Sequence, residues 1–200
     1  MRSVGIHDHP DLGPAARRMS GVLAGLPDGE LPAPTPCVNT SVGDLIDHVM
    51  ALALAFREAA EKSGSVADGP PPAPSAANLP SDWRDLLARR LDDLAAAWRD
   101  PAAWQGTTAA GGLEPPGQEA GLVALDELVL HGWDLARATG QPYACGPAEV
   151  DACLAFVANV PDDPQAREGL FGPVIDVPED APPFDRLLGL SGRDPSWVPA

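Results

Sequence analysis

The sequence predicts an all-α fold in which four helices form a bundle and one long connection crosses between two of them. Apolar residues recur at helical spacing in five segments of the 200-residue chain, a length that suits one domain with a sizeable core. Prolines are concentrated between these segments, and alanine, which favours helices, is abundant. No convincing run of alternating apolar and polar residues indicates a strand. A bundle with one long crossover connection fits this order of elements.

The first three predicted helices show a helical period of apolar residues and recognisable start or stop signals. They cover Leu12 to Leu26, Val42 to Lys62 and Ser81 to Trp98. Ser41 is expected to cap the second helix, and Asp44, three residues later, supplies the acidic partner of a weak capping box. The second helix is therefore expected to begin at Val42.

Two connections are expected to hold little regular structure. Residues 63–80 are rich in Pro, Ala and Ser and poor in large apolar side chains, so they predict the long crossover connection as a mobile loop. Residues 100–117 are expected to be irregular or to contain a short extended segment.

The last two predicted helices cover Gln118 to Ala138 and Pro147 to Val160. The remaining residues, 161–200, are rich in proline but hold enough apolar side chains to dock on the bundle rather than dangle. We therefore expect a single domain made of a bundle, residues 1–160, and a C-terminal extension, residues 161–200, packed on it. The apolar side chains of the extension are Phe171, Val174, Ile175, Phe184, Leu187, Leu188, Leu190 and Trp197.

The charge balance excludes several classes of partner. Thirteen Lys and Arg against 29 Asp and Glu give a net charge of −16, which argues against nucleic acid and anionic membrane surfaces. No apolar run is long enough to span a membrane, and residues 1–20 lack the apolar core of a signal peptide. The three cysteines are Cys37, Cys145 and Cys153, an odd and widely spaced set that indicates a reducing compartment. A cytoplasmic protein is expected.

His48, Glu127 and His131 are the candidate metal ligands. Glu127 and His131 are four residues apart, so on a helix both side chains project from one face. With a histidine from another helix they would form a two-histidine, one-carboxylate site, which leaves coordination positions open for water or substrate. Two alternatives stay open: His48 as a core histidine satisfied by one hydrogen bond, and Glu127 with His131 as a solvated pair.

Other residues near these positions carry weaker signals. Asp134 is either a hydrogen-bond acceptor that orients the His131 ring or a surface partner of Arg137. Trp133 is expected to pack in the core. Cys37 is expected to be a small buried residue rather than a nucleophile. The run His7-Asp8-His9 invites a metal interpretation, but chain ends rarely hold such sites.

Four stretches of the chain resemble the DinB-like metal-binding superfamily, and within it the actinobacterial branch related to mycothiol-dependent maleylpyruvate isomerase. The second predicted helix and its approach contribute PTPC (34–37) and DLIDHV (44–49). The strongest match is ELVLHGWDLARATG (127–140), and the ending DRLLGLSGRDP (185–195) matches again. The resemblance implies a DinB-like four-helix bundle that binds a divalent metal through His48, Glu127 and His131. We expect zinc, with nickel or iron as alternatives, and mycothiol as a cosubstrate.

Two departures from the branch lie close to His48. Residues 38–41 read VNTS where the branch has a short turn ending in an aromatic residue, and Gly43 stands where a basic residue is common. The isomerases also carry a separate C-terminal domain, whereas this chain has only the extension 161–200. These departures suggest a specialised reaction.

The predicted function is that of a metal-dependent enzyme acting on a small electrophilic substrate, as a mycothiol-type thiol transferase or isomerase. Asp134 would support the metal ligands, and Arg186 or Arg137 would meet an anionic substrate. The chain is expected to be a monomer or homodimer. The alternatives are a non-catalytic divalent-metal-binding protein and a bundle that catalyses a metal-independent reaction. An enzyme should have a substantial concave cavity above the metal, lined by polar as well as apolar groups.

Overall fold

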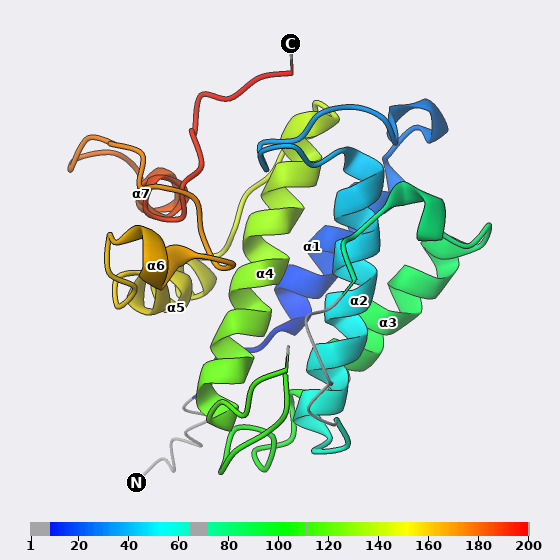
Figure 1. Cartoon of the computed structure of the whole chain (residues 1–200), viewed down its shortest axis with the longest axis vertical. Helices are drawn as coiled ribbons and strands as arrows, with labels where there is room; N and C mark the ends of the chain where they lie inside the picture. Colours follow the sequence, from blue (N-terminus) through cyan, green and yellow to red (C-terminus); the bar gives the residue numbers. More distant parts are fainter. Residues whose placement is uncertain (1–8, 65–71, 111, 200) are drawn as a thin grey trace, which may run out of the picture.

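The computed structural model shows an all-α protein, as predicted, and it describes residues 9–64, 72–110 and 112–199 (Figure 1). Within these ranges there are seven α-helices and no strand. Helix α2 contacts α3 and α4, and α1 contacts the same two helices, so the four form a bundle. Their bounds are Gly13–Ala24 for α1, Val42–Ala60 for α2, Trp83–Ala97 for α3 and Gly117–Ala138 for α4.

Helix α2 begins where its capping signal places it. The Ser41 side chain accepts a hydrogen bond from the Asp44 backbone N–H, and the Asp44 carboxylate accepts one from the Ser41 N–H, so the predicted capping box is formed. The helix ends at Ala60, two residues earlier than predicted. Lys62 has a left-handed backbone, with φ of 55°, and its ammonium group donates to the carbonyls of Ala103 and Gln105. Those contacts tie the end of α2 to the loop before α4.

Helix α4 is the most deeply enclosed element and carries two of the three predicted metal ligands, Glu127 and His131. Aromatic side chains pack closely against it at two glycines: a Cβ on Gly121 would lie 2.4 Å from Trp104, and one on Gly132 would lie 2.4 Å from the Tyr143 hydroxyl. The Tyr143 hydroxyl also donates to the Val129 carbonyl at 2.9 Å. These close approaches hold the segments on both sides of α4 against it.

The segments after α4 form three further helices beside it (Figure 1). Helix α5 ends three residues earlier than predicted, and it contacts both α4 and α7. The apolar side chains Leu187 and Leu188 of α7 are buried in the main core. The two short helices after α5 were not predicted as helices, and the division of the chain at residue 160 stays a prediction. The bounds are Pro147–Val157 for α5, Pro164–Arg167 for α6 and Pro183–Leu190 for α7.

The long connection between α2 and α3 is fastened to the start of α2. Residues 65–71, the middle of the predicted mobile loop, lie outside the described residues. Beyond them, the backbone N–H of Ser75 donates to Asp47, and that of Ala76 donates to Asp44. A Cβ on Gly43 would lie 2.6 Å from the Ala76 side chain, so this connection fills the space that a larger residue would need.

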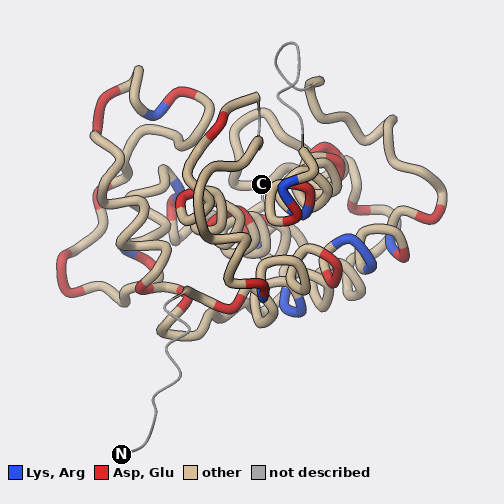
Figure 2. The backbone as a smooth tube through the Cα atoms, turned by 90° about the horizontal axis from the view of Figure 1, so that it is seen from below, with Lys and Arg blue, Asp and Glu red and all other residues tan. Residues whose placement is uncertain are grey.

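Residues 100–110 and 112–116 are irregular and form two isolated antiparallel bridges, one between Thr107 and Pro116 and one between Ala110 and Leu113. Acidic positions are spread over many parts of the backbone, whereas basic positions are fewer (Figure 2). In the described part of the chain, the helices are too short or too polar to cross a membrane.

Candidate metal centre

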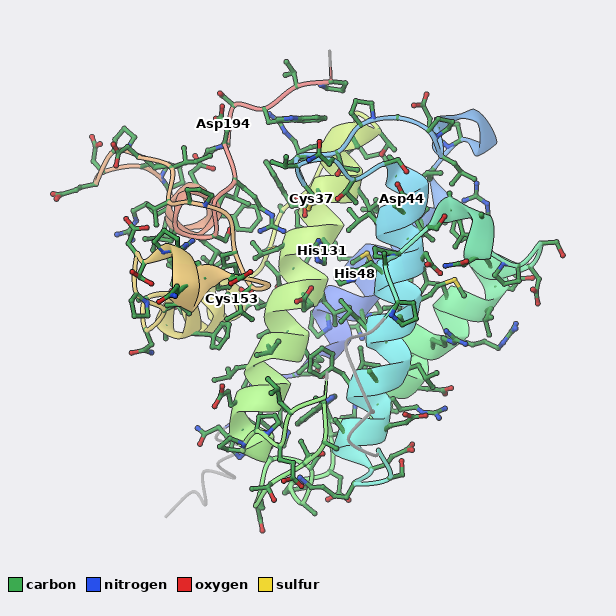
Figure 3. The ribbon with its side chains drawn as sticks, in the orientation of Figure 1. Cys37, Asp44, His48, His131, Cys153 and Asp194 are labelled. Atoms are coloured by element: carbon green, nitrogen blue, oxygen red, sulfur yellow. The ribbon has the colours of Figure 1, made fainter. Side chains whose placement is uncertain are left out.

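The structure brings the three predicted ligands together between two helices of the bundle. His48 comes from α2, and Glu127 and His131 come from α4. Figure 3 shows His48 and His131 between these helices. Their ring centroids are 5.0 Å apart and the ring planes are almost perpendicular, at 87°. The two imidazoles therefore approach edge to face rather than stacking.

The ligand atoms converge on one small region. The Nε2 atom of His131 lies 2.8 Å from Oε2 of Glu127, and Nε2 of His48 lies 3.7 Å from the same oxygen. One donor atom from each of the three residues lies within 4.8 Å of the others. The His48 and Glu127 side chains are 36% and 26% exposed, so His48 is not an enclosed core histidine. The set offers two nitrogens and one carboxylate with a solvent-facing side, which suits a divalent transition metal.

The protein holds Glu127 and His131 as a strongly coupled pair. Burial alone would raise the pKa of Glu127, but the charge of His131 and hydrogen bonds from both histidines lower it well below its usual range. Burial alone would lower the pKa of His131, but the charge of Glu127 and the hydrogen bond to Asp134 raise it well above 6.5. Without a metal, a proton on His131 balances the Glu127 carboxylate.

Asp134 orients the His131 ring from the side opposite Glu127. It is fully buried, and its Oδ2 lies 2.9 Å from Nδ1 of His131. An ionised carboxylate only accepts hydrogen bonds, so Nδ1 carries a hydrogen, and in the neutral ring that a metal ligand requires Nε2 is the nitrogen left free to coordinate. The alternative of Asp134 as a surface partner of Arg137 is wrong, because the Arg137 guanidinium donates to the Pro195 carbonyl instead.

Arg193 is the residue of the site that sequence reasoning missed. Its Nε donates to Oδ1 of Asp134 at 2.9 Å and its Nη2 to Oδ2 at 2.8 Å, in a two-pronged contact that is almost completely buried. Burial alone would raise the pKa of Asp134, but the charge of Arg193 and hydrogen bonds from His131 and Arg193 lower it to about 2. The two arginines proposed for an anionic substrate lie elsewhere: Arg186 is exposed, and Arg137 holds Pro195.

Cys37 lies on the same side of the His131 ring as Asp134. Its thiol donates to Oδ2 of Asp134 at 3.1 Å, and the sulfur is 3.9 Å from Nδ1 of His131. Cys37, His131 and Asp134 thus form a second group with ligand atoms within 4.8 Å of one another. The Arg193 guanidinium lies 3.7 Å from the sulfur and already neutralises the carboxylate. A second cation there would meet that positive charge, so this group is a poor metal site.

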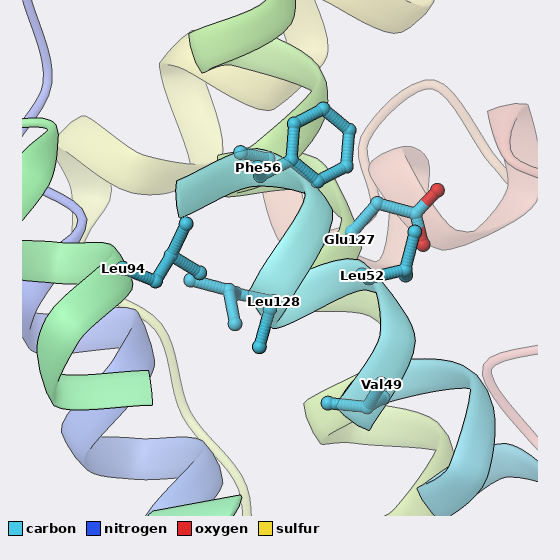
Figure 4. A pocket seen from close by; sticks show the side chains of 8 residues that line it. Val49, Leu52, Phe56, Leu94, Glu127 and Leu128 are labelled. Carbon is cyan, nitrogen blue, oxygen red and sulfur yellow. The ribbon is translucent and has the colours of Figure 1, made fainter. Parts of the chain in front are cut away.

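Two hollows lie near the centre, and they differ in character. The one beside Glu127 is apolar, has a volume of about 10 Å³ and is lined by α2, α3 and α4 side chains such as Leu52 and Phe56 (Figure 4). It has room for about one water molecule. A larger, open and more polar hollow of about 380 Å³ runs along residues 32–41 and reaches Cys37. Of these two hollows, the one that Glu127 lines is far smaller than the substantial cavity expected above a catalytic metal, and the larger one reaches Cys37 instead.

Two other residues singled out in the sequence, Trp133 and His9, pack against the protein. Trp133 is buried in the core, as expected. The His9 ring stacks on Trp104 with centroids 4.5 Å apart and planes nearly parallel, whereas His7 and Asp8 lie outside the described residues. In the first of the two departures near His48, residues 38–41, Val38 is 84% exposed and Asn39 takes a left-handed backbone with φ of 58°.

Comparison with known proteins agrees with the fold. The family model described as the mycothiol maleylpyruvate isomerase N-terminal domain matches residues 12–136. The chain is 31% identical over 180 residues to the uncharacterized protein Rv0738 of Mycobacterium tuberculosis strain H37Rv, covering 87% of this chain and 91% of that one. The uncharacterized protein MT0763 of strain CDC 1551 matches to the same extent.

A solved structure shares the fold. The crystal structure of the mycothiol-dependent maleylpyruvate isomerase superposes with a TM-score of 0.55 at 19% identity, covering 76% of this chain and 70% of that one. The family model covers residues 12–136, which include the parts of the bundle helices that carry His48, Glu127 and His131. The chain therefore belongs to the family of the mycothiol maleylpyruvate isomerase N-terminal domain.

Proposed function

We propose that the protein is a divalent-metal-dependent enzyme that uses a low-molecular-weight thiol of the mycothiol kind against a small electrophilic substrate, as a transferase or an isomerase. The observation that carries this proposal is the convergence of His48, Glu127 and His131 within 4.8 Å, with His48 and Glu127 partly exposed. Membership of a family named for a mycothiol-dependent isomerase supports the thiol and the substrate class.

The three ligands fit a metal that works rather than one that only supports the fold. Two neutral imidazoles and one carboxylate leave a divalent ion with a net charge of +1 and with open coordination positions. Such an ion supplies Lewis acidity, which lowers the pKa of a thiol and stabilises negative charge that develops on a substrate oxygen. Zinc is the metal we expect first, with nickel or iron as alternatives.

The residues of the chain have separate tasks in this scheme. His48 and His131 present ring nitrogens from opposite helices, and Glu127 supplies the one anionic ligand. Asp134 holds the proton on Nδ1 of His131, so that Nε2 stays available as a ligand. The apolar wall of Leu52 and Phe56 limits water on the side of Glu127.

The test is a metal analysis of the untagged protein combined with two assays in the presence of mycothiol: conjugation of the thiol to an electrophile, and isomerisation of a substrate, in which the thiol is regenerated. We expect one divalent metal per chain, and turnover with maleylpyruvate or with a bimane electrophile that stops on chelation and returns when metal is added. Glu127→Gln should lose metal and activity, whereas Glu119→Gln, an exposed change on the same helix, should keep both. Full turnover in a verified metal-free preparation would contradict the proposal.

A second candidate function is a divalent-metal-binding protein without catalysis. The size of the hollow beside Glu127, about 10 Å³, favours it, because ligand pockets for small molecules are typically about 300–1,000 Å³. The two candidates separate in the assay above. A protein that binds metal through Glu127 but neither conjugates a thiol to any electrophile nor isomerises a substrate in its presence would be the non-catalytic one.

A further inference from the structure

The His131 ring is held by a chain of contacts that begins in the C-terminal segment. Arg193 follows α7, donates to both oxygens of Asp134, and donates from Nη1 to the Ser191 carbonyl at 3.2 Å. Asp134 in turn accepts from Nδ1 of His131. Each link in this chain is buried, so the contacts have no water to compete with them.

The geometry leaves Asp134 little freedom. Its Oδ2 receives hydrogen bonds from His131, Cys37 and Arg193, and its Oδ1 receives one from Arg193. A planar guanidinium that contacts both oxygens fixes the plane of a carboxylate as well as its position. Without Arg193, the carboxylate would keep single contacts to His131 and Cys37, about which it could rotate.

We propose that Arg193 is a positioning residue for the metal centre: it fixes the Asp134 carboxylate, which sets the orientation and tautomer of His131 so that Nε2 faces His48 and Glu127. The inference rests on the proposed metal function and deepens it. It makes the segment after α7 part of the centre, although that segment supplies no metal ligand.

A simpler role for Arg193 would be to anchor the C-terminal segment to α4. The chain offers a matched control for that role, because Arg137 of α4 anchors the same segment through the Pro195 carbonyl at 3.1 Å without touching Asp134. If anchoring alone mattered, losing Arg137 would affect the metal as losing Arg193 does. If Arg193 acts through Asp134, only the loss of Arg193 should change metal affinity.

The experiment measures the dissociation constants of Zn²⁺ and Co²⁺ by competition with a chromophoric chelator, with no enzyme assay. Arg193→Ala should weaken binding by about 10–100-fold, the range typical of changes behind a ligating histidine. Arg137→Ala should leave affinity unchanged. In an Asp134→Asn background, Arg193→Ala should add almost nothing, because both changes break the same chain of contacts.

Two further measurements can still contradict the proposal if Arg193→Ala folds poorly. Arg193→Lys keeps the charge but loses the two-pronged contact, so it should bind metal with intermediate affinity. Methylguanidinium at millimolar concentration should restore part of the affinity of Arg193→Ala and none of that of Asp134→Asn. Circular dichroism and melting of the metal-free variants identify which of them are folded.

The outcomes are distinct. Three outcomes would each overturn the positioning role while leaving the metal centre intact. The first is unchanged metal affinity in a folded Arg193→Ala, and the second is an equal loss of affinity in Arg137→Ala. The third is that the losses for Arg193→Ala and Asp134→Asn add in full in the double variant. If wild type and His131→Ala bind metal equally weakly, the proposed function itself fails.

Discussion

Each ring nitrogen of His131 lies beside a cluster of possible metal ligands. The two clusters are alike in the distances between donor atoms but differ in charge. On the Nε2 side stand Glu127 and His48, and on the Nδ1 side stand Asp134 and Cys37, with ligand atoms within 4.8 Å in each cluster. The Nδ1 cluster already contains a cation, since Arg193 forms a buried ion pair with Asp134. The Nε2 cluster has a carboxylate balanced only by the proton of an imidazole, which a metal can replace. Proximity of donor atoms is therefore a weaker criterion for a metal site than the charge that remains to be neutralised.

The largest effect expected from this comparison is the loss of metal on removing the ring that both clusters share. His131→Ala should abolish metal binding, because it leaves only His48 and Glu127 as ligands. Cys37→Ala should leave the metal content unchanged, because the sulfur belongs to the cluster that Arg193 neutralises. Elemental analysis after dialysis measures both. Metal lost from Cys37→Ala but kept in His131→Ala would reverse the assignment of the two clusters.

A smaller loss of metal affinity is expected when the hydrogen bond between Asp134 and His131, which links the two clusters, is weakened. Asp134→Asn keeps the shape of the side chain but removes the carboxylate that receives the Nδ1–H, so metal binding should weaken by about 10–100-fold. Competition titration against a chelator of known affinity gives the ratio. Wild-type affinity in this variant would mean that the Nδ1 cluster does nothing for the Nε2 cluster.

The pH dependence of metal binding sharpens the same comparison. In the metal-free protein the pKa of His131 is raised well above 6.5, chiefly by the charge of Glu127, so the proton stabilises the fold at low pH and that contribution is lost as pH rises through the raised pKa. Metal must displace this proton. Below the raised pKa, affinity should fall about tenfold per pH unit, and binding should release a proton. The loss of metal affinity on acidification should therefore begin well above pH 6.5, the ordinary pKa of histidine.

Isothermal titration in buffers of different ionisation enthalpy counts the released proton, and dissociation constants at several pH values give the slope. An affinity that stays constant through neutral pH, with no proton released, would show that His131 is neutral before metal arrives.

The smallest expected effect is the change in stability on replacing the Cys37 thiol. Cys37→Ser keeps a donor for Asp134, and Arg193 continues to hold that carboxylate, so the free energy of unfolding should change by less than about 1 kcal/mol. Chemical denaturation measures it. A much larger loss would indicate that the Cys37 contact, rather than Arg193, fixes Asp134.

The Nε2 cluster could be predicted from the sequence because its information is local. Glu127 and His131 are four residues apart on one helix, and His48 follows a readable cap by seven residues, so residue type and helical period sufficed. The same reasoning left two alternatives open for Asp134, which burial decided. Helices α1 to α5 were predicted to within a few residues at their ends for the same reason.

Arg193 could not be predicted in the same way, because its contact with Asp134 spans 59 residues and depends on how the C-terminal segment packs. Its only signal was its place in the block 185–195. Helices α6 and α7 are short and each begins with a proline, and helices this short depend on packing for their stability. The separation of the two hollows likewise follows from side-chain packing.

X-ray absorption at the metal edge of the protein loaded with one equivalent of Zn²⁺, without any added thiol, tests the central claim most directly. The account predicts a first shell of nitrogen and oxygen alone at about 2.0–2.2 Å, with imidazole scattering from two histidines. Sulfur at about 2.3 Å in the first shell would place the metal in the Cys37 cluster and contradict the account.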